Sequence, residues 1–258
     1  GGVMKLLEEA GAVRALVRRG YTVYELSRRA EGMPDIRHIV ADITKEETLQ
    51  AAVEQVLAVE GRLDLVVNNA GFGISGAIEF TDTQEAQRLF DTLFFGMVRM
   101  NRCVIPLMRQ QGHGRIVNIS SVAAPVPIPF QAYYSAGKAA INAYTMALAN
   151  ELRPFGVTVC AVMPGDIKTG FTAARHKIID GDDIYQGRIG RSVQRMEHDE
   201  QTGMDPAKVG RYIAAVASRE GSHHPLYATR IDYKFFVFLT KVLPARFLNW
   251  LIYQLYGK

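Results

Sequence analysis

The stretch RIVNISSVAAPVPIPFQAYYSAGK, residues 115–138, decides the fold class of this 258-residue chain. It begins with an apolar run, Arg115–Ile119, that predicts a strand. A polar turn and a segment with alternating prolines follow, and residues 131–153 predict a helix. A strand followed by a long helix is part of a βαβ unit, so a repeat of this order along the chain would predict a parallel sheet.

The sequence on either side repeats this order. It predicts further strands at Tyr21–Leu26, Ile36–Val40, Leu63–Val67 and Val157–Val162, and further helices at 3–19, Lys45–Val59, Asp82 to about Gln110, and 206–218. Strands that alternate with helices of this length form right-handed βαβ units, and the helices cover both faces of the sheet. We therefore expect an α/β fold with a doubly wound parallel sheet in three αβα layers.

The composition is that of an ordinary globular protein, with 48% apolar and 22% charged residues. The net charge of +4 is small and basic residues are mixed with acidic ones, which argues against a nucleic-acid partner. We find no signal-peptide pattern and no uninterrupted run of about 18 apolar residues, so we expect a cytoplasmic protein. No linker composition interrupts the chain, and residues 1–258 are expected to form a single domain.

The cysteines and histidines give little sign of a disulfide or a metal site. Cys103 and Cys160 lie in apolar runs far apart in the sequence, as expected of thiols in a reducing compartment. His198, His223 and His224 have no carboxylate or thiol at ligand spacing, so no metal is predicted.

Tyr134 and Lys138 are the first candidates for chemistry. A spacing of four places both side chains on one face of the predicted helix. A free tyrosine has a pKa near 10, too high for an acid or base at neutral pH, and a neighbouring ammonium lowers that pKa. The pair therefore suits a general acid/base at a carbonyl or carbinol oxygen. Tyr133 has no such partner, because Gly137 stands four residues after it.

Three polar clusters end three successive strands. They are Asn68–Gly71, Asn118–Ser121 and Pro164–Thr169, and Ser121 precedes Tyr134 in the segment quoted above. Because ligands of open parallel sheets bind at the carboxyl ends of the strands, we expect these clusters to meet at one edge.

This set of residues resembles the short-chain dehydrogenase/reductase family. Within that family, the segments Gly71–Gly73 and Phe90–Gly96 and the long apolar C-terminal tail resemble the 17β-hydroxysteroid dehydrogenase-like branch. The resemblance implies a Rossmann-like fold and assigns the acid/base to Tyr134. Lys138 would lower the pKa of Tyr134 and hold the nicotinamide ribose, and Ser121 would hydrogen-bond the substrate oxygen. The resemblance also assigns residues to the cofactor: Asp42 and Ile43 beside the adenine, Asn68, Asn69, Ala70 and Gly71 in the supporting turn, and Pro164, Gly165, Ile167 and Thr169 near the carboxamide and phosphates.

The residues after the second strand bear on the choice of cofactor. Arg28 and Arg29 follow it, and Ser27 occupies the position where an acid would bind the ribose 2′-hydroxyl of NAD. An arginine suits a 2′-phosphate instead, so NADP(H) is favoured over NAD(H). Gly71, Gly73 and Gly76 match the G-x-G-x-x-G fingerprint, but no helix starts directly after them, so we do not expect a phosphate loop there.

Two features depart from the family pattern. Leu93 stands where the family carries an asparagine that holds a proton-relay water. The chain also starts directly at the predicted helix 3–19, so the first strand and the Gly-rich loop are expected to be missing or rearranged. We expect a strand-shaped gap between the strands at 21–26 and 63–67, or direct pairing of the two. No normal phosphate loop in residues 1–11 and no tightly held cofactor are then expected.

The C-terminal third leaves several interpretations open. Residues 171–204 are expected to form a substrate lid, and residues 232–258 an apolar extension that Pro244 divides into two short helices. The extension fits ordinary packing against the domain or a second subunit, a lid over an apolar substrate, or, less favoured, peripheral contact with a membrane.

We predict an NADP(H)-dependent oxidoreductase that interconverts a carbonyl and a secondary alcohol on an apolar, steroid- or lipid-like molecule. A homodimer or homotetramer is the expected assembly. The alternative is a cofactor-impaired relative that acts as a binding or regulatory protein.

Overall fold

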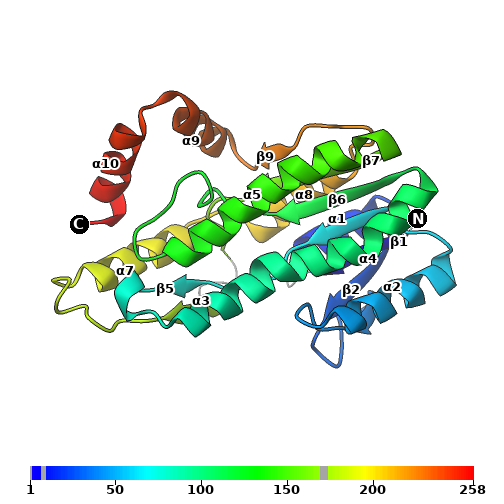
Figure 1. Cartoon of the computed structure of the whole chain (residues 1–258), viewed down its shortest axis with the longest axis horizontal. Helices are drawn as coiled ribbons and strands as arrows, with labels where there is room; N and C mark the ends of the chain where they lie inside the picture. The colour runs from blue at the N-terminus through cyan, green and yellow to red at the C-terminus, as the bar shows by residue number, and fades with distance from the viewer. Residues whose placement is uncertain (1, 7–9, 169–173) are drawn as a thin grey trace.

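The computed structural model describes residues 2–6, 10–168 and 174–258. Seven parallel strands form the main sheet in the order β3-β2-β1-β4-β6-β7-β9 (Figure 1). The strands are β1 Gly2–Leu6, β2 Thr22–Ser27, β3 Arg37–Val40, β4 Leu65–Asn68, β6 Gly114–Ile119, β7 Val157–Met163 and β9 Leu226–Ala228. Two-residue strands β5 Ile74–Ser75 and β8 His176–Lys177 pair separately. The predicted doubly wound α/β fold is confirmed.

The predicted N-terminal helix at 3–19 is wrong in its first half. Gly2–Leu6 is a strand that pairs in parallel with β2 on one side and with β4 on the other, and helix α1 covers Ala10–Arg18. A short apolar run cannot be assigned to helix or strand by periodicity alone, and here two neighbouring ladders satisfy its backbone groups. The sheet therefore has neither the expected gap nor a direct β2–β4 pair. Residues 7–9, which follow β1, lie outside the described residues.

The remaining predicted elements lie within two residues of those observed. The helices are α2 Glu46–Glu60, α5 Ala132–Leu152 and α8 Pro206–Ala217. The long helix predicted from Asp82 is divided into α3 Thr83–Phe90, a π-helical turn at Asp91–Phe95 and α4 Gly96–Gln111. Asp82 and Asp205 cap α3 and α8 by accepting the backbone N–H of Gln84 and Ala207.

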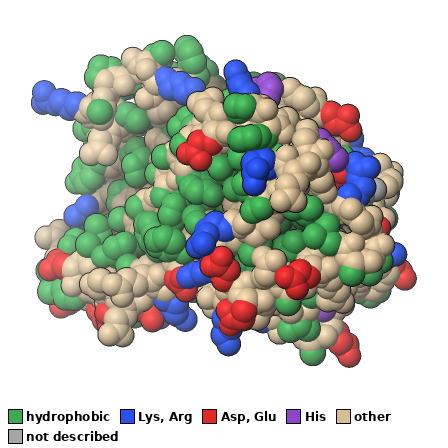
Figure 2. All heavy atoms as spheres, turned by 45° about the vertical axis from the view of Figure 1, so that its right-hand side comes forward, with side chains coloured by type: hydrophobic (Ala, Val, Ile, Leu, Met, Phe, Trp, Pro, Cys, Tyr) green, Lys and Arg blue, Asp and Glu red, His purple; other side chains and the backbone are tan. Residues whose placement is uncertain are grey.

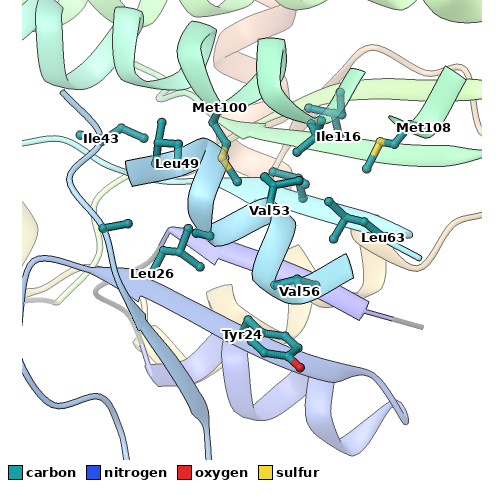
Figure 3. Packing of buried hydrophobic residues seen from close by; sticks show 14 of the residues in the cluster. Tyr24, Leu26, Ile43, Leu49, Val53, Val56, Leu63, Met100, Met108 and Ile116 are labelled. Carbon is teal, nitrogen blue, oxygen red and sulfur yellow. The ribbon is translucent and has the colours of Figure 1, made fainter. Parts of the chain in front are cut away.

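Helices cover both faces of the sheet. Adjacent residues of β6 point to opposite faces, so Ile116 packs with α2 and α4 while Val117 packs with α1 and α8. Figure 3 shows the first core, where Val53 of α2 and Met100 of α4 meet above β2. On the other face α1 and α8 approach so closely that a Cβ at Gly210 would lie 2.3 Å from the carbonyl carbon of Gly11.

The C-terminal segment leaves the three layers. After β9 the chain forms α9 Ile231–Val242 and α10 Ala245–Tyr256, which project from the body in Figure 1. The break at Leu243 and Pro244 confirms the predicted pair of short helices. In the part of the chain that the structure describes, no helix has the length and apolarity needed to cross a membrane.

Candidate active site

The polar clusters at the ends of β4, β6 and β7 meet around one pocket of about 410 Å³. Its lining includes Asn69, Ala70 and Gly71 after β4, Ser121 after β6, Tyr134 and Lys138 on α5, and Pro164, Gly165, Asp166 and Ile167 after β7. The structure therefore brings together most of the residues that the sequence analysis singled out.

Tyr134 and Lys138 occupy the pocket wall formed by α5. Lys138 is buried, its Nζ lies 5.6 Å from the centroid of the Tyr134 ring, and it donates a hydrogen bond to the carbonyl oxygen of Ile119 at 2.8 Å. That bond holds the ammonium near the Tyr134 ring, in the same pocket. Tyr133 and Tyr134 both pack against the cluster around Leu93, but only Tyr134 is among the residues that line the pocket.

Ser121 presents its hydroxyl group to the pocket. Its Oγ accepts the backbone N–H of Ala123 at 3.1 Å, which leaves the hydroxyl proton available to an acceptor in the pocket. The neighbouring Ser120 is buried, and its Oγ donates to the carbonyl oxygen of Lys138 at 3.1 Å. Of the two serines, Ser121 is the one suited to hold a substrate oxygen.

A buried amide network supports the pocket from below. The side-chain amide of Asn68 donates to the Oδ1 atoms of Asn101 and Asn118, at 2.8 and 2.9 Å, and Asn118 donates to Thr145 at 3.0 Å. These bonds tie β4 and β6 to α4 and α5. Asn68 was predicted to contact the cofactor, but it lies beneath the pocket lining. The sequence analysis missed Asn101, an isolated amide on the apolar face of α4.

The residues predicted to hold the adenosine end lie after β2 and β3. Arg28 is exposed, whereas Arg29 forms an ion pair with the buried carboxylate of Glu25. The backbone N–H and the hydroxyl of Thr44 both donate to Asp42, and these hydrogen bonds lower the pKa of the Asp42 carboxyl. Ile43 is buried behind them. Thr169 lies outside the described residues.

The C-terminal helices close one side of the pocket. Tyr233 and Phe236 of α9 and Leu255 and Tyr256 of α10 all line it. The Tyr256 hydroxyl donates to Asp199 at 2.9 Å and so anchors α10 to α7, which covers Arg188–Gln201 within the predicted lid region. Figure 2 shows hydrophobic side chains gathered between the projecting helices and the body.

The segment between Ser121 and α5 forms another part of the wall. Val126 and Ile128, which alternate with the three prolines, line the pocket. Proline fixes φ and has no backbone N–H to donate, so this segment is a stiff and largely apolar surface.

Comparisons with known proteins agree with this geometry. A family model described as short chain dehydrogenase matches residues 3–178. The chain belongs to the short-chain dehydrogenase family.

Several family members resemble it over most of its length. The 3-ketodihydrosphingosine reductase of Bacteroides thetaiotaomicron is 37% identical over 239 residues, which are 92% of this chain and 86% of that protein. Dehydrogenase/reductase SDR family member 7B of Xenopus tropicalis is 31% identical over 175 residues, 68% of this chain and 53% of that protein. A short-chain dehydrogenase from Streptomyces avermitilis superposes with a TM-score of 0.81 at 31% identity, covering 92% of this chain and 91% of that one.

As a short-chain dehydrogenase, the chain is an oxidoreductase that acts on a carbonyl or an alcohol and uses a nicotinamide cofactor. The same fold holds NADP in the structure of ElxO, which has a TM-score of 0.74 at 23% identity and covers 91% of this chain and 98% of that one. The residues present here fit the nicotinamide half of such a cofactor. Residues at the ends of β4 and β7 line the crevice of the parallel sheet, and the buried Lys138 lines it too.

Leu93 remains a departure from the family pattern. It lies in the π-helical turn and is almost fully buried. A Cβ at Gly71 or at Gly137 would lie 2.8 or 2.4 Å from its methyl groups, so the leucine fills a niche that both glycines leave open. The family asparagine would make hydrogen bonds at this position, whereas Leu93 packs against Gly71 and Gly137.

Both cysteines are free thiols, and Cys160 is buried while Cys103 is half-buried. Burial raises the pKa of each thiol to about 11. Among the described residues no group of three or more histidine, cysteine, aspartate or glutamate side chains is placed to hold a metal ion. Gly71–Gly76 contains the short strand β5 and does not open an α-helix directly, unlike a phosphate-binding fingerprint.

Proposed function

We propose that this chain is an NADP(H)-dependent reductase that converts the ketone of a long-chain lipid to a secondary alcohol, with 3-ketodihydrosphingosine as the first candidate substrate. The observation that carries the proposal is the pocket itself. Ser121, Tyr134 and Lys138 line it, and most of the remaining wall is apolar. The 37% identity to a 3-ketodihydrosphingosine reductase over 92% of the chain supports this choice over a steroid.

The residues of the pocket would have different roles in the reduction. The hydroxyl groups of Ser121 and Tyr134 would hold the carbonyl oxygen by hydrogen bonds. The reduced nicotinamide, when bound, supplies the hydride. Tyr134 would donate its proton to the oxygen as negative charge develops there, and the Lys138 ammonium would stabilise the resulting phenolate. The position of Lys138 supports this division, because its Nζ is held in the pocket by the Ile119 carbonyl.

The preference for NADP(H) is supported by the difference between the two arginines after β2. The Glu25 carboxylate already engages Arg29. Among the described residues no acidic side chain forms an ion pair with Arg28, which is exposed beside Asp42. A free guanidinium at the end of the second strand suits a 2′-phosphate.

The apolar wall supports a substrate with a long hydrocarbon chain. Phe236 and Leu255 of the two C-terminal helices line the pocket that also contains Tyr134, and so do Val126, Ile128 and Met196. Burying a methylene group in such a wall contributes about 0.8 kcal/mol, so a chain of many methylenes would bind far better than a short ketone.

The direct test is NADPH oxidation by the purified chain with a panel of ketones. We expect reduction of 3-ketodihydrosphingosine with a kcat/KM at least about tenfold above that of steroid ketones and of butanone. Nicotinamide fluorescence should report NADPH binding in parallel. NADPH binding without turnover of any long-chain ketone would contradict the proposed reductase and favour a lipid-binding relative. A preference for steroids would contradict the substrate class.

A further inference from the structure

The pocket contains a carboxylate that the proposed reduction does not use. Asp166 follows β7 and lines the pocket together with Ser121 and Tyr134. Its loop is tied to the loop of Ser121, because the backbone N–H of Val122 donates to the carbonyl oxygen of Pro164 at 3.0 Å. The loop of Asp166 and the loop of Ser121 are therefore neighbours in the wall of one pocket.

A tyrosine from the C-terminal helices holds this carboxylate in place. The Tyr233 hydroxyl accepts the backbone N–H of Asp166 at 3.0 Å and faces its Oδ2 at 3.3 Å. The Tyr233 ring covers Gly165 so closely that a Cβ there would overlap the ring. Burial raises the pKa of Tyr233 to about 12, so the phenol stays protonated as a hydrogen-bond donor.

The charges around Asp166 are unbalanced. Nearby, Glu200 is paired with the buried Arg175, and Asp199 lies 3.2 Å from Arg195. Arg230, which packs on the Tyr233 ring, is paired with Asp232. In the described part of the chain, no basic side chain forms an ion pair with Asp166 itself. Burial, and then the negative charges of Asp199 and Glu200, raise the pKa of its carboxyl.

A partly buried carboxylate without a cationic partner is costly unless a ligand supplies the opposite charge. The ordinary structural duties of Asp166 do not require the charge, because its backbone N–H and carbonyl make the bonds to Tyr233 and Met204. We propose that the Asp166 carboxylate binds an ammonium group of the substrate, on a carbon close to the reacting carbonyl, with Tyr233 as the residue that positions it. The preferred substrates are then long-chain amino ketones.

This inference rests on the proposed reductase function and adds a specificity residue to it. 3-Ketodihydrosphingosine carries an ammonium group on the carbon next to its ketone, so one molecule would meet Ser121, Tyr134 and Asp166 at once. Lys138 lies in the same pocket, but its charge is directed to the Ile119 carbonyl on the α5 side. Asp166 would thus meet the ammonium group of the substrate, while Lys138 would stabilise the Tyr134 phenolate.

The test compares Asp166→Asn with wild type on three ketones of equal chain length. They carry an ammonium, an acetamido group or hydrogen on the carbon next to the carbonyl. Loss of a charge-assisted hydrogen bond should lower kcat/KM for the amino ketone relative to the hydrogen analogue by roughly 10- to 100-fold. Asp180→Asn, an exposed change outside the pocket, is the matched control and should keep the wild-type ratio.

Thermal unfolding at pH 8 provides the second readout. Because the fold raises the pKa of Asp166, the charged carboxylate is a cost above that pKa, and Asp166→Asn should keep or raise the Tm. Equal losses on all three ketones together with a lower Tm would show a structural role and overturn the inference. So would an unchanged ratio in an active enzyme, and that result would leave the proposed reductase function standing. If the wild type reduced the hydrogen analogue but not the amino ketone, the assignment of 3-ketodihydrosphingosine would fail as well.

Discussion

Leu93 is a packing residue at a position where the family carries an asparagine for proton transfer. It fills the niche between Gly71 and Gly137 and also borders the pocket next to Lys138. A leucine cannot hold the relay water that the family pattern implies, so we expect protons to reach Lys138 by another path.

We expect Leu93→Asn to have two separate effects. The buried amide would lower the free energy of unfolding by about 1–3 kcal/mol, measured by urea denaturation. It would also shift the pH profile of kcat by restoring a water site near Lys138. Leu89→Asn is the matched control, because Leu89 is equally buried in the same cluster but does not line the pocket. A profile that moved in neither variant would show that protons arrive independently of position 93.

We expect the guanidinium group of Arg28 to distinguish NADPH from NADH. Arg28→Ala should weaken NADPH binding roughly 10- to 100-fold, the value of a charge-assisted hydrogen bond, and change NADH binding little. Titration of nicotinamide fluorescence with both cofactors measures the difference. Arg19→Ala, at the opposite end of the strands, is the control. Equal losses of NADPH and NADH would assign Arg28 another role.

At the scale of elements, the approach of α1 to α8 fixes one layer of the fold. The helices touch through backbone atoms of Gly11 and Gly210, so this contact leaves no room for side chains. This contact holds α8 against α1, the helix of the N-terminal βα unit, on one face of the sheet. None of the sequence motifs of the site indicates this contact between α1 and α8.

Gly210→Ala should therefore destabilise the chain even though alanine favours a helix. The new methyl group would meet the Gly11 backbone, and such overpacking costs about 1–3 kcal/mol, more than the roughly 1 kcal/mol gained in helix propensity. Gly190→Ala in α7 is the control, since its Cβ would meet only the end of the Asp182 side chain at 3.0 Å. Thermal denaturation of both variants decides the matter, and a Gly210→Ala protein as stable as wild type would contradict the packing described here.

The sequence predicted most elements because their hydrophobic periods are long and clear. It failed at Gly2–Leu6, where five residues are too few to distinguish a strand from the start of a helix and where pairing with β2 and β4 decides the outcome. At the site, spacing along α5 was enough to find Tyr134 and Lys138. Asp166 and Tyr233 were missed as a pair because they are 67 residues apart and meet through the fold alone.

At the scale of the whole molecule, the C-terminal helices link the catalytic edge of the sheet to the surface. α9 and α10 line the pocket with one set of residues and expose others, among them Phe235, Phe238 and Trp250. Whether this exposed face meets a second subunit or a membrane stays a prediction, as does the expected homodimer or homotetramer. The two helices therefore contribute both to the pocket wall and to the exposed surface.

The central claim is that Tyr134 protonates a ketone while a hydride from NADPH reduces it. The most direct measurement incubates the chain with NADPH deuterated at the transferred position and with a long-chain ketone, and follows deuterium in the alcohol by mass spectrometry. We predict one deuterium per product in wild type and in Tyr133→Phe. In Tyr134→Phe we predict a rate lower by about 100-fold or more with NADPH binding retained. Deuterium transfer at a near wild-type rate in Tyr134→Phe would contradict the account.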